Sequence, residues 1–505
     1  MDSNEFRQAA VSAIDEIANY YDTIEDRRVI SNVEPGYLRK LLPDGPPQIG
    51  EPWADIQKDI EAKIMPGLTH WQSPNFMAFF PASSSYPGIL GELYSAAFTA
   101  PAFNWACSPA MTELETIVLD WLANLINLPE CYQSSSTGGG VIHGSASEAI
   151  LTVMMVAREK YLDQVTSHLT GISKEEAMHY KKSKMVVLGS ETTHSSTQKA
   201  AKILGFRFVS IPVYPEDNYA LTGANLEKIL LECKLAELEP FFLTVTLGTT
   251  TTCAIDDFSS ILSTIERLKP VGQSEELWVH VDAAYVGAAL VCPEFHHHTA
   301  TFGHFHSFNL NAHKWLLTNF DATCLFLKER KHIIEHLSIN ASYLDNTASE
   351  NGHVIDYRDW QIPMGRRFRS LKIWFVLRTY GVTGIQAYIR NHIRLGEIFA
   401  SLCRERCDLF KIVAGPSFAL TVFTVVSKIS QDNELTKAVF QAVYQRGQLH
   451  LTPCAIGGVQ MIRLVCANRL VEESHVRRAF KILVEVAEEL RDLETRSQQR
   501  PENYT

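Results

Sequence analysis

A lysine and an aspartate stand out in the sequence because together they could hold and activate one cofactor. Lys314 lies in the run 307–315, SFNLNAHKW, and Asp282 lies in the apolar run 277–284, LWVHVDAA. An amine that forms a Schiff base and a carboxylate that pairs with a pyridine nitrogen are what pyridoxal phosphate requires from a protein. Alone, such a lysine is usually a surface cation and such an aspartate a helix cap or turn residue. The pair therefore predicts a pyridoxal phosphate site only in combination with further motifs.

A glycine-rich run is the first of these motifs. The sequence 137–148, TGGGVIHGSASE, opens a predicted helix whose apolar residues follow the spacing of one helical face. Glycines allow a backbone to approach a ligand closely, and a helix N-terminus offers free N–H groups to a phosphate. Ser147 is placed to add its hydroxyl. The alternative interpretation is a flexible loop with an ordinary serine cap.

Two other segments bring polar residues to the ends of predicted strands. His194 follows the strand expected at 184–188, and Thr249 follows the strand expected at 241–246. A histidine at a strand end can lie flat on an aromatic cofactor ring, although an isolated one is usually a surface residue. Ligands of parallel sheets bind beyond the carboxyl ends of the strands. We therefore expect His194, Thr249 and Asp282 to converge on one crevice.

The elements that must position these residues alternate along the middle of the chain. Helical stretches separate apolar, strand-like runs at 184–188, 208–213, 241–246, 277–281 and 323–327. Strands this apolar predict a mostly parallel α/β sheet covered by helices. We predict a large domain over residues 86–372. A small α+β domain should follow over 373–505, with strands near 419–426 and 461–465.

The first 85 residues have little core of their own. Apolar residues between Phe6 and Tyr21 follow helical spacing, and prolines between 35 and 52 then interrupt the pattern. Either the main body or a second subunit must cover this apolar stripe. We predict that residues 1–85 form a helical arm involved in dimerisation.

Composition narrows the class of protein. With 505 residues, 46% of them hydrophobic, the chain can bury more than one core. The net charge of −11 is spread along the chain, and without a basic block we expect no nucleic-acid partner. Ten scattered cysteines are typical of a reducing compartment. Because the N-terminus is polar and apolar runs are short, we expect a cytoplasmic protein that binds no membrane.

Five histidines between 296 and 306 raise the question of a metal site. Adjacent histidines cannot easily point at one ion, and no cysteine or carboxylate stands at a recognised zinc spacing. A solvated loop is the favoured interpretation, and we expect no metal.

From about residue 5 to residue 490, the sequence resembles the aromatic L-amino-acid decarboxylase family, group II pyridoxal-phosphate enzymes of fold type I, the aspartate aminotransferase fold. The motifs above carry the likeness, together with His70-Trp71, Phe79-Phe80-Pro81, the run 108–115 (SPAMTELE) and the run 359–370 (DWQIPMGRRFRS). The resemblance implies a large domain with a mostly parallel seven-stranded sheet and a small C-terminal domain. It also implies a homodimer and pyridoxal 5'-phosphate as cofactor.

The resemblance assigns roles to individual residues. Lys314 would hold the cofactor covalently, Asp282 would keep its ring nitrogen protonated, and His194 would stack on the ring. The cofactor would also contact Ala146, Ser147, Thr249, Ala284, Asn311 and His313. The substrate would be contacted by Trp71, Phe79, Phe80, Pro81, Ala82, Phe103 and Gly365, some of them reaching across a dimer.

Two residues bear on the reaction. The catalytic loop of the family matches 338–352, and its functional tyrosine falls on Tyr343. Decarboxylases carry Tyr there as proton donor and plant aldehyde synthases carry Phe, whereas some insect aldehyde synthases replace the stacking histidine, here His194. Both residues favour decarboxylation of an aromatic L-amino acid to an arylalkylamine and CO2.

Three alternatives use the same scaffold. An aromatic aldehyde synthase would also remove the amine oxidatively. An aminotransferase would use the same Lys and Asp, with Arg463 as a candidate for binding a carboxylate. A catalytically silent dimeric scaffold would keep only the fold.

Gly365 bears on the substrate. Relatives that prefer phenolic substrates in plants, or histidine in animals, often have Ser there, and Gly leaves room for a larger ring. We therefore expect tryptophan or 5-hydroxytryptophan, with dopa, tyrosine and phenylalanine left open. His143, where Gln is usual, and Phe79, where many members have Tyr, depart from the family pattern near the phosphate and the substrate.

Overall fold

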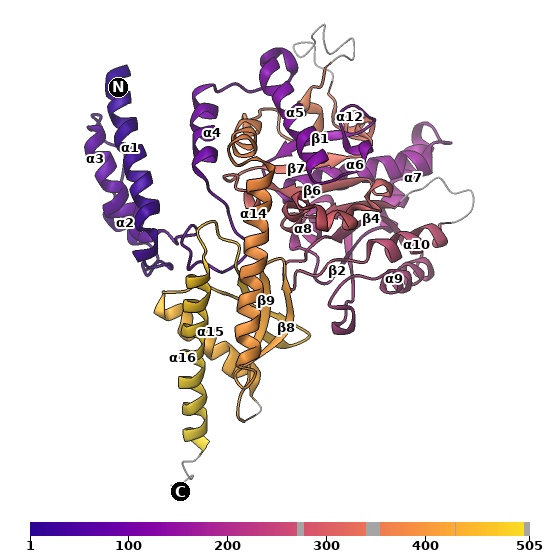
Figure 1. Ribbon diagram of the computed structural model, residues 1–505. Coiled ribbons are helices and arrows are strands. Elements are labelled where there is room, and N and C mark those ends of the chain that lie inside the picture. Colours follow the sequence, from indigo (N-terminus) through magenta and orange to yellow (C-terminus); the bar gives the residue numbers. More distant parts are fainter. Residues whose placement is uncertain (270–276, 340–353, 430, 499–505) are drawn as a thin grey trace. The chain divides into compact units, whose positions relative to one another are not determined.

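The computed structural model of the protein describes residues 1–269, 277–339, 354–429 and 431–498 (Figure 1). Contacts between residues divide the chain into two compact units, one of Met1–Pro81 with His392–Thr505 and one of Ala82–Asn391. Each unit is described below by itself. The three predicted domains, with boundaries at residues 85 and 372, stay a prediction.

The unit Ala82–Asn391 is built on a seven-stranded sheet with the strand order β1-β7-β6-β5-β4-β2-β3. The strands are β1 (Gly139–His143), β2 (Met185–Ser190), β3 (Arg207–Ile211), β4 (Glu239–Thr246), β5 (Trp278–Asp282), β6 (Ser307–Asn311) and β7 (Thr323–Leu327). Strands β2 to β6 run parallel to one another, and β7 is antiparallel to both β1 and β6. The predicted mostly parallel sheet is confirmed.

The glycine-rich run belongs mainly to strand β1, which is fully buried. A Cβ atom on Gly138 would lie 2.0 Å from the carbonyl oxygen of Cys131 and 2.2 Å from that of Leu327. Glycine is therefore needed at position 138, because any side chain there would collide with the backbone at Cys131 and Leu327. The approach of these glycines to a ligand stays a prediction, and Gly144 lies in the turn before the next helix.

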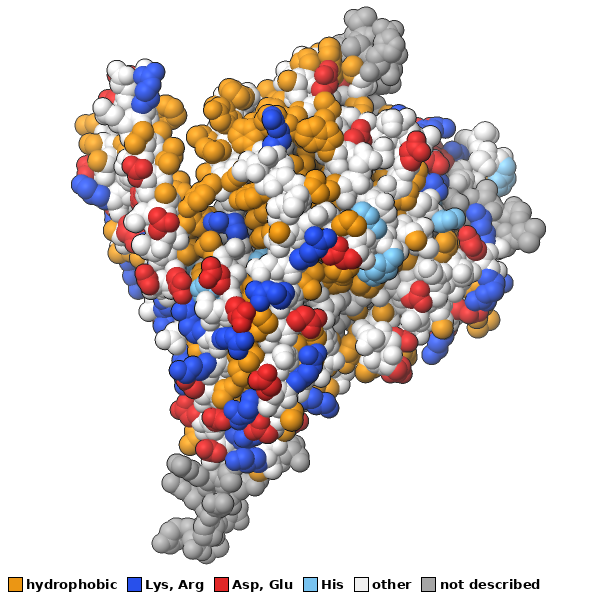
Figure 2. All heavy atoms as spheres, viewed as in Figure 1, with side chains coloured by type: hydrophobic (Ala, Val, Ile, Leu, Met, Phe, Trp, Pro, Cys, Tyr) orange, Lys and Arg blue, Asp and Glu red, His pale blue; other side chains and the backbone are white. Residues whose placement is uncertain are grey.

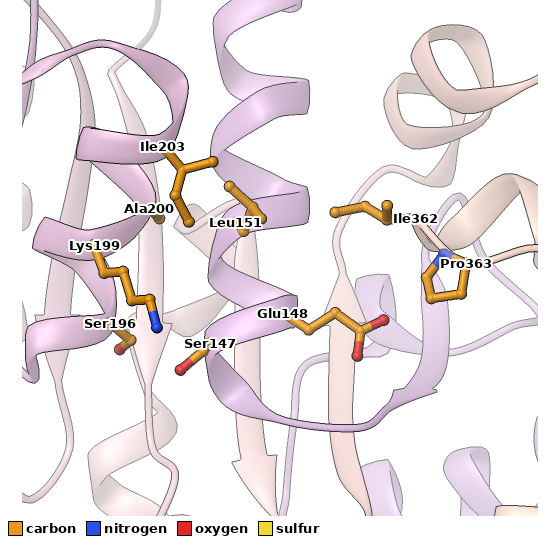
Figure 3. A pocket seen from close by; sticks show the side chains of 9 residues that line it. All are labelled: Ser147, Glu148, Leu151, Ser196, Lys199, Ala200, Ile203, Ile362 and Pro363. Carbon is orange, nitrogen blue, oxygen red and sulfur yellow. The ribbon is translucent and has the colours of Figure 1, made fainter.

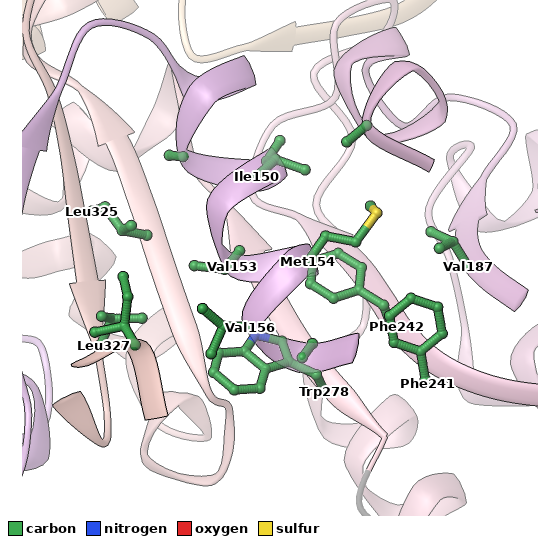
Figure 4. Close-up of a cluster of buried hydrophobic side chains, with 14 of the residues drawn as sticks. Ile150, Val153, Met154, Val156, Val187, Phe241, Phe242, Trp278, Leu325 and Leu327 are labelled. Carbon is green, nitrogen blue, oxygen red and sulfur yellow. The ribbon is translucent and has the colours of Figure 1, made fainter. Parts of the chain in front are cut away.

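That helix, α6 (Ala146–Thr166), packs against much of the sheet. Its cap Ser145 accepts a hydrogen bond from the backbone N–H of Glu148. Figure 4 shows side chains of α6 directed at buried strand residues, namely Val187, Phe241, Phe242, Trp278, Leu325 and Leu327. Each such side chain contributes about 1.5–3 kcal/mol when it is removed from water. Helix α6 and the sheet thus form a packed base for the residues at the strand ends.

Other helices cover the sheet and its edges. Helix α8 (Ser195–Leu204) contacts β2 and β3, α9 (Gly223–Leu235) contacts β3 and β4, and α5 (Pro109–Leu125) contacts β1. The other α-helices among the described residues of this unit are α4 (Tyr86–Ala97), α7 (Gly171–Lys184), α10 (Phe258–Leu268), α11 (Ala312–Trp315) and α12 (Arg330–Leu337), and α14 (Arg369–Glu405) begins here. This alternation of strands and helices is the one predicted from the sequence.

The other unit contains both ends of the chain. Strands β8 (Phe410–Ser417), β9 (Leu420–Val425), β10 (Thr452–Ile456) and β11 (Val459–Val465) form an antiparallel sheet in the order β10-β11-β9-β8. Helix α15 (Asp432–Arg446) packs on β9 and β11, and α16 (Glu473–Gln498) packs on α15. The predicted small α+β arrangement is confirmed.

The N-terminal segment of this unit contains α1 (Ser3–Thr23), α2 (Tyr37–Leu41) and α3 (Trp53–Asp59). Farther along, Phe76 forms a parallel bridge with His450. The Met77 N–H donates to the His450 carbonyl at 3.0 Å, and the Met77 carbonyl accepts from Val465 at 2.9 Å. Backbone hydrogen bonds therefore tie the N-terminal segment to the small sheet.

Two features of the described residues bear on binding to a membrane and to a metal ion. None of the helices in these ranges has the length and apolar character required to cross a bilayer. Within the same ranges, no three His, Cys, Asp or Glu side chains gather in a way that could hold a metal ion.

Candidate active site

Asp282 is the last residue of β5 and is only 3% exposed. Its Oδ1 accepts hydrogen bonds from the Ala284 N–H at 3.0 Å and from Asn309 Nδ2 at 3.4 Å. Both hydrogen bonds from described residues go to Oδ1, so Oδ2 can accept one from a ligand. A buried carboxylate with an available oxygen fits a protonated ring nitrogen, because burying a charge is favourable only when it is paired.

A chain of buried side chains orients this carboxylate. The Trp278 indole donates to Ser307 Oγ at 2.9 Å, and Ser307 Oγ lies 2.8 Å from His280 Nδ1. His280 Nε2 lies 2.7 Å from Asn309 Oδ1. Burial lowers the pKa of His280 to about 4, so the ring is neutral and carries its proton on Nε2, the nitrogen that faces the amide oxygen.

Sequence reasoning missed His280 and Asn309. Trp278, His280 and Asp282 alternate along β5, and Ser307 and Asn309 alternate along β6, with His280 opposite Ser307 and Asp282 opposite Asn309. Residues two apart in a strand point to the same face of the sheet. This alternation was the signal that could have identified them.

Lys314 lies on the short helix α11, directly after β6. Ser83 holds the backbone there, because its N–H donates to the His313 carbonyl at 2.7 Å and its hydroxyl donates to the Lys314 carbonyl at 2.6 Å. The neighbouring Trp315 ring stacks on Tyr285 with centroids 4.6 Å apart. The lysine backbone is therefore fixed on both sides. Ser83 is a third residue that sequence reasoning missed, since its partner lies 231 residues away.

His194 precedes α8 as its cap. Its Nδ1 accepts from the Ser196 N–H at 3.2 Å and lies 2.8 Å from the Ser196 hydroxyl, so Nε2 carries the proton of the neutral ring. Burial lowers the pKa of His194, the Asp282 carboxylate opposes that effect, and the Lys314 ammonium adds to it. Asp282 and Lys314 thus both lie close enough to His194 for their charges to act on its ring, and their joint role in holding a cofactor stays a prediction.

The predicted phosphate-binding residues offer hydrogen-bond donors. Ala146 and Ser147 are the first two residues of α6, where backbone N–H groups have no partner within the helix. Asn311 accepts from the Thr323 hydroxyl at 2.9 Å through Oδ1, and its amide nitrogen donates to no described residue. His313 Nδ1 lies 2.9 Å from both backbone N and O of Ala322, and burial lowers its pKa to about 4, which keeps the ring neutral. This donor set fits a dianionic phosphate.

Thr249 and Ala284 shape the same edge of the sheet. Thr249 is fully buried, and its hydroxyl accepts from the Ala254 N–H at 3.0 Å and lies 3.1 Å from the Thr252 hydroxyl. The Ala284 carbonyl accepts from the Asn311 N–H at 3.1 Å. Thr249 therefore stabilises the turn after β4, and Ala284 joins the ends of β5 and β6.

A cavity of about 290 Å³ adjoins the start of α6 (Figure 3). Ser147 is the one predicted site residue that lines it, so the cavity lies beside the predicted phosphate end and not around Lys314. Figure 3 shows the Lys199 amine directed toward Ser147 and Ser196. Sequence reasoning missed Lys199, whose only signal was its place in the helix that follows His194.

Three of the predicted substrate residues lie in the same unit as Lys314. Ala82 directly precedes Ser83. Phe103 and Gly365 belong to neighbouring segments, since the Phe103 carbonyl accepts from the Arg358 N–H at 3.0 Å and the Pro101 carbonyl from the Arg366 N–H at 2.8 Å. A Cβ atom on Gly365 would meet no atom within 4 Å. Neither packing nor a left-handed backbone requires glycine there within the chain.

The other four predicted substrate residues belong to the unit with the small sheet. The Trp71 and Phe79 rings stack with centroids 5.5 Å apart and planes at 15°. The Arg463 guanidinium lies 4.8 Å from the centroid of the Phe80 ring. Pro81 borders a small hollow with Trp71. The structure thus brings Trp71, Phe79 and Pro81 together, and Phe80 lies against Arg463.

Tyr343 and residues 340–352 of the predicted catalytic loop lie outside the described residues.

Comparison with known proteins identifies the family. A model of the pyridoxal-dependent decarboxylase conserved domain matches residues 35–426. The chain belongs to this family. The predicted resemblance and the predicted cofactor, pyridoxal 5'-phosphate, are confirmed.

Curated relatives match this family member over nearly its whole length. It is 42% identical to tyrosine decarboxylase 2 of Narcissus pseudonarcissus, with 96% of this chain and 95% of that protein covered. It is 43% identical to phenylacetaldehyde synthase of Arabidopsis thaliana, with 96% of each covered. It is 41% identical to aromatic-L-amino-acid decarboxylase of Rattus norvegicus, with 96% and 98% covered. The protein is therefore a carboxy-lyase of the aromatic amino acid decarboxylase family.

Solved structures agree with this membership. Oryza sativa TDC with PLP and tryptamine has a TM-score of 0.91 at 34% identity, with 97% of this chain and 99% of that chain covered. Catharanthus roseus tryptophan decarboxylase in complex with L-tryptophan has a TM-score of 0.88 at 38% identity, with the same coverage. The predicted type I fold is confirmed.

Proposed function

We propose that this family member decarboxylates an aromatic L-amino acid to the corresponding arylalkylamine and CO2. Tryptophan and 5-hydroxytryptophan are the favoured substrates, and dopa, tyrosine and phenylalanine are the other candidates. The observation that carries the proposal is the buried Asp282 carboxylate at the carboxyl end of β5, which lies close enough to His194, as does Lys314, for its charge to act on the histidine ring. Relatives named as tyrosine and tryptophan decarboxylases support the substrate class.

In this proposal, the protein holds the cofactor at both ends. Bound pyridoxal phosphate supplies an electron sink for the bond that the leaving carboxylate gives up. Lys314 would hold it covalently, His194 would stack on its ring, and Asp282 Oδ2 would accept a hydrogen bond from its protonated ring nitrogen. The N-terminus of α6, with Ser147, Asn311 and His313, receives the phosphate. Thr249 and Ala284 shape the surface against which the ring lies.

The burial of Asp282 is important for this role. A fixed charge pair is screened poorly in a site from which water is excluded, so an oriented carboxylate is worth more there than in solvent. The buried chain from Trp278 to Asn309 keeps that carboxylate in one orientation. Tyr343 then delivers a proton to the substrate Cα, and its loop excludes water.

The aromatic side chain of the substrate is proposed to contact the stacked Trp71 and Phe79 rings, with Phe80, Pro81 and Ala82 beside them. Phe103 and Gly365 are the proposed contacts that discriminate between ring sizes. A pocket lined by aromatic rings is typical of sites that bind planar apolar groups.

We also propose a homodimer. Helix α1 exposes Phe6, Val11 and Ile14, each more than half accessible. Figure 2 shows hydrophobic side chains gathered over α4, where Leu90 and Tyr94 are exposed. Exposed apolar faces of this kind mark interaction surfaces. We propose a cytoplasmic location as well, because the ten scattered cysteines, all of them among the described residues, form no disulfide.

One experiment tests the proposed reaction. Purified protein is incubated separately with tryptophan, 5-hydroxytryptophan, tyrosine, phenylalanine and dopa, and the products are identified by mass. An arylalkylamine with CO2 supports the proposal. An aldehyde with hydrogen peroxide would instead indicate an aldehyde synthase, and a keto acid an aminotransferase. Lys314→Ala serves as the control and should form none of these products.

A further inference from the structure

Phe79 has an unusual backbone conformation. Its φ is +53°, in the left-handed region that bulky residues rarely adopt. Strained conformations persist where the surroundings hold them, and they cluster at ligand sites. The contacts of Phe79 should therefore identify the residues that hold this backbone conformation and the function that it serves.

A single side chain accepts the hydrogen bond of the strained residue. Up to Met77, the segment pairs through its backbone with His450 and Val465. Beyond that point, the Phe79 N–H donates instead to Thr452 Oγ1 at 2.6 Å. Thr452 is buried at the start of β10, so its hydroxyl has a fixed position.

The residue opposite Thr452 holds the next aromatic ring. Thr452 pairs with Arg463 across β10 and β11, and the Arg463 guanidinium lies over the Phe80 ring. One cross-strand pair thus fixes two consecutive aromatic residues, Phe79 through its backbone and Phe80 through a cation–π contact.

The left-handed conformation of Phe79 leaves its ring and the ring of Trp71 partly exposed to solvent. Phe79 stacks on Trp71, and the two side chains remain 43% and 38% exposed. His450 packs edge-on against Phe79, with centroids 5.9 Å apart. The Trp71 carbonyl accepts from Asn468 Nδ2 at 2.9 Å. Two nearly parallel exposed rings with rigid backing form a surface for a planar aromatic group.

We infer that Thr452 is a positioning residue that determines which aromatic side chains the enzyme accepts, by holding Phe79 in register with Trp71. The inference rests on the proposed function, because it takes the aromatic side chain of the substrate as the ligand of these rings. Without the hydroxyl, the Phe79 N–H loses its acceptor, the left-handed turn relaxes, and the ring shifts off Trp71.

The test compares Thr452→Ala with Thr452→Ser, which keeps the hydroxyl. For Thr452→Ala, we expect KM for tryptophan to rise about tenfold, the size of one lost hydrogen bond, with kcat within about twofold. The ratio of kcat/KM between tryptophan and tyrosine should change as well. The near-ultraviolet circular dichroism of the aromatic residues should weaken, while cofactor absorbance stays the same. Thr452→Ser should restore KM, the kcat/KM ratio and the near-ultraviolet circular dichroism to wild-type values.

Other outcomes overturn the inference. Unchanged KM and selectivity in Thr452→Ala would do so, and so would equal defects in Thr452→Ala and Thr452→Ser. If Thr452→Ala does not fold, Thr452→Val is measured in its place under the same criteria. If the wild-type enzyme acts on no aromatic amino acid, the proposed function fails. If the wild-type enzyme is active and Thr452→Ala has the same KM and selectivity, only the role of Thr452 is refuted.

Discussion

His280 Nε2 lies 2.7 Å from Asn309 Oδ1 between β5 and β6, and this contact fixes the direction of the Asn309 amide. Because the amide oxygen faces His280, the amide nitrogen faces Asp282 Oδ1 at 3.4 Å. Neutral side chains on two buried strands therefore set the orientation of the carboxylate that we propose to face the cofactor.

Replacement of Asn309 tests this arrangement. Asn309→Leu should lower the free energy of unfolding by about 1–3 kcal/mol, because it leaves the buried His280 Nε2 without a partner and Asp282 Oδ1 with one hydrogen bond in place of two. It should also weaken cofactor binding. Urea denaturation and titration with pyridoxal phosphate measure the two effects. The exposed Asn433→Leu is the matched control, and equal losses in both variants would count against the arrangement.

His143 gives the stability a predicted pH dependence. Its Nε2 lies 3.1 Å from the Trp360 carbonyl, and burial lowers its pKa from 6.5 to about 4. Between these values the folded state binds fewer protons than the unfolded state, so stability falls as the pH drops from 6.5 to 4. The contribution of His143 to this loss is at most about 3 kcal/mol. In urea denaturation at several pH values, His143→Gln should lose less stability than the wild type, and parallel curves would contradict the prediction.

The buried ion pair next to Gly365 should be worth far more than an exposed one. Arg366 Nη2 lies 2.6 Å from Glu115 Oε1, and both side chains are nearly inaccessible. Glu115→Gln leaves a buried guanidinium without its counter-charge, so we expect a loss of about 3–5 kcal/mol. Glu294→Gln breaks the exposed pair with Arg390 and should cost at most about 1 kcal/mol. Thermal and urea denaturation compare the two, and similar losses would refute the prediction.

Gly365 should affect selectivity without affecting folding. Because a Cβ atom there meets no atom within 4 Å, Gly365→Ser should keep the wild-type melting temperature. We expect the ratio of kcat/KM for tryptophan over tyrosine to fall by at least about tenfold, the usual effect of a methylene-sized change in a pocket. Gly45→Ser, also in open space, is the control. An unchanged ratio would remove Gly365 from the proposed substrate contacts.

Tyr343 should decide between the two reactions of the family. If it protonates the substrate Cα, Tyr343→Phe should divert turnover toward an aldehyde with release of ammonia, because the proton donor is lost while the bound carbon remains reactive. Mass analysis of the products under air, with a peroxide assay, measures this partition. A variant that still yields amine alone would argue against the role of Tyr343.

The sequence predicted those strands that are continuously apolar. The strand at 323–327 has the limits predicted for it, since both its faces are buried. Strands β1 and β6 were not located from their residues, because Gly139, Gly140, Ser307 and Asn309 carry no apolar pattern. Their extended form depends on pairing with β7, which a local pattern cannot reveal.

For the candidate site, the sequence motifs identified residues expected to touch the cofactor. They missed the residues whose hydrogen bonds hold the site in place. Asp282 and His194 were predictable because each follows an apolar strand, and Lys314 was predictable from its pairing with Asp282 and from the family motif around it. Ser83 and Thr452 were not, since their hydrogen bonds join segments 231 and 373 residues apart. Supporting contacts of this kind follow from tertiary packing.

The place of β7 in the sheet has a consequence for biosynthesis. Strand β1 hydrogen-bonds to the sheet only through β7, although β7 follows it by about 180 residues in the order of translation. A nascent chain that ends before Thr323 has no strand to pair with Gly139–His143, although α5 and the Glu115 carboxylate already contact β1. We therefore expect β1, and with it the turn that starts α6, to reach its final place only after β7 has been synthesised.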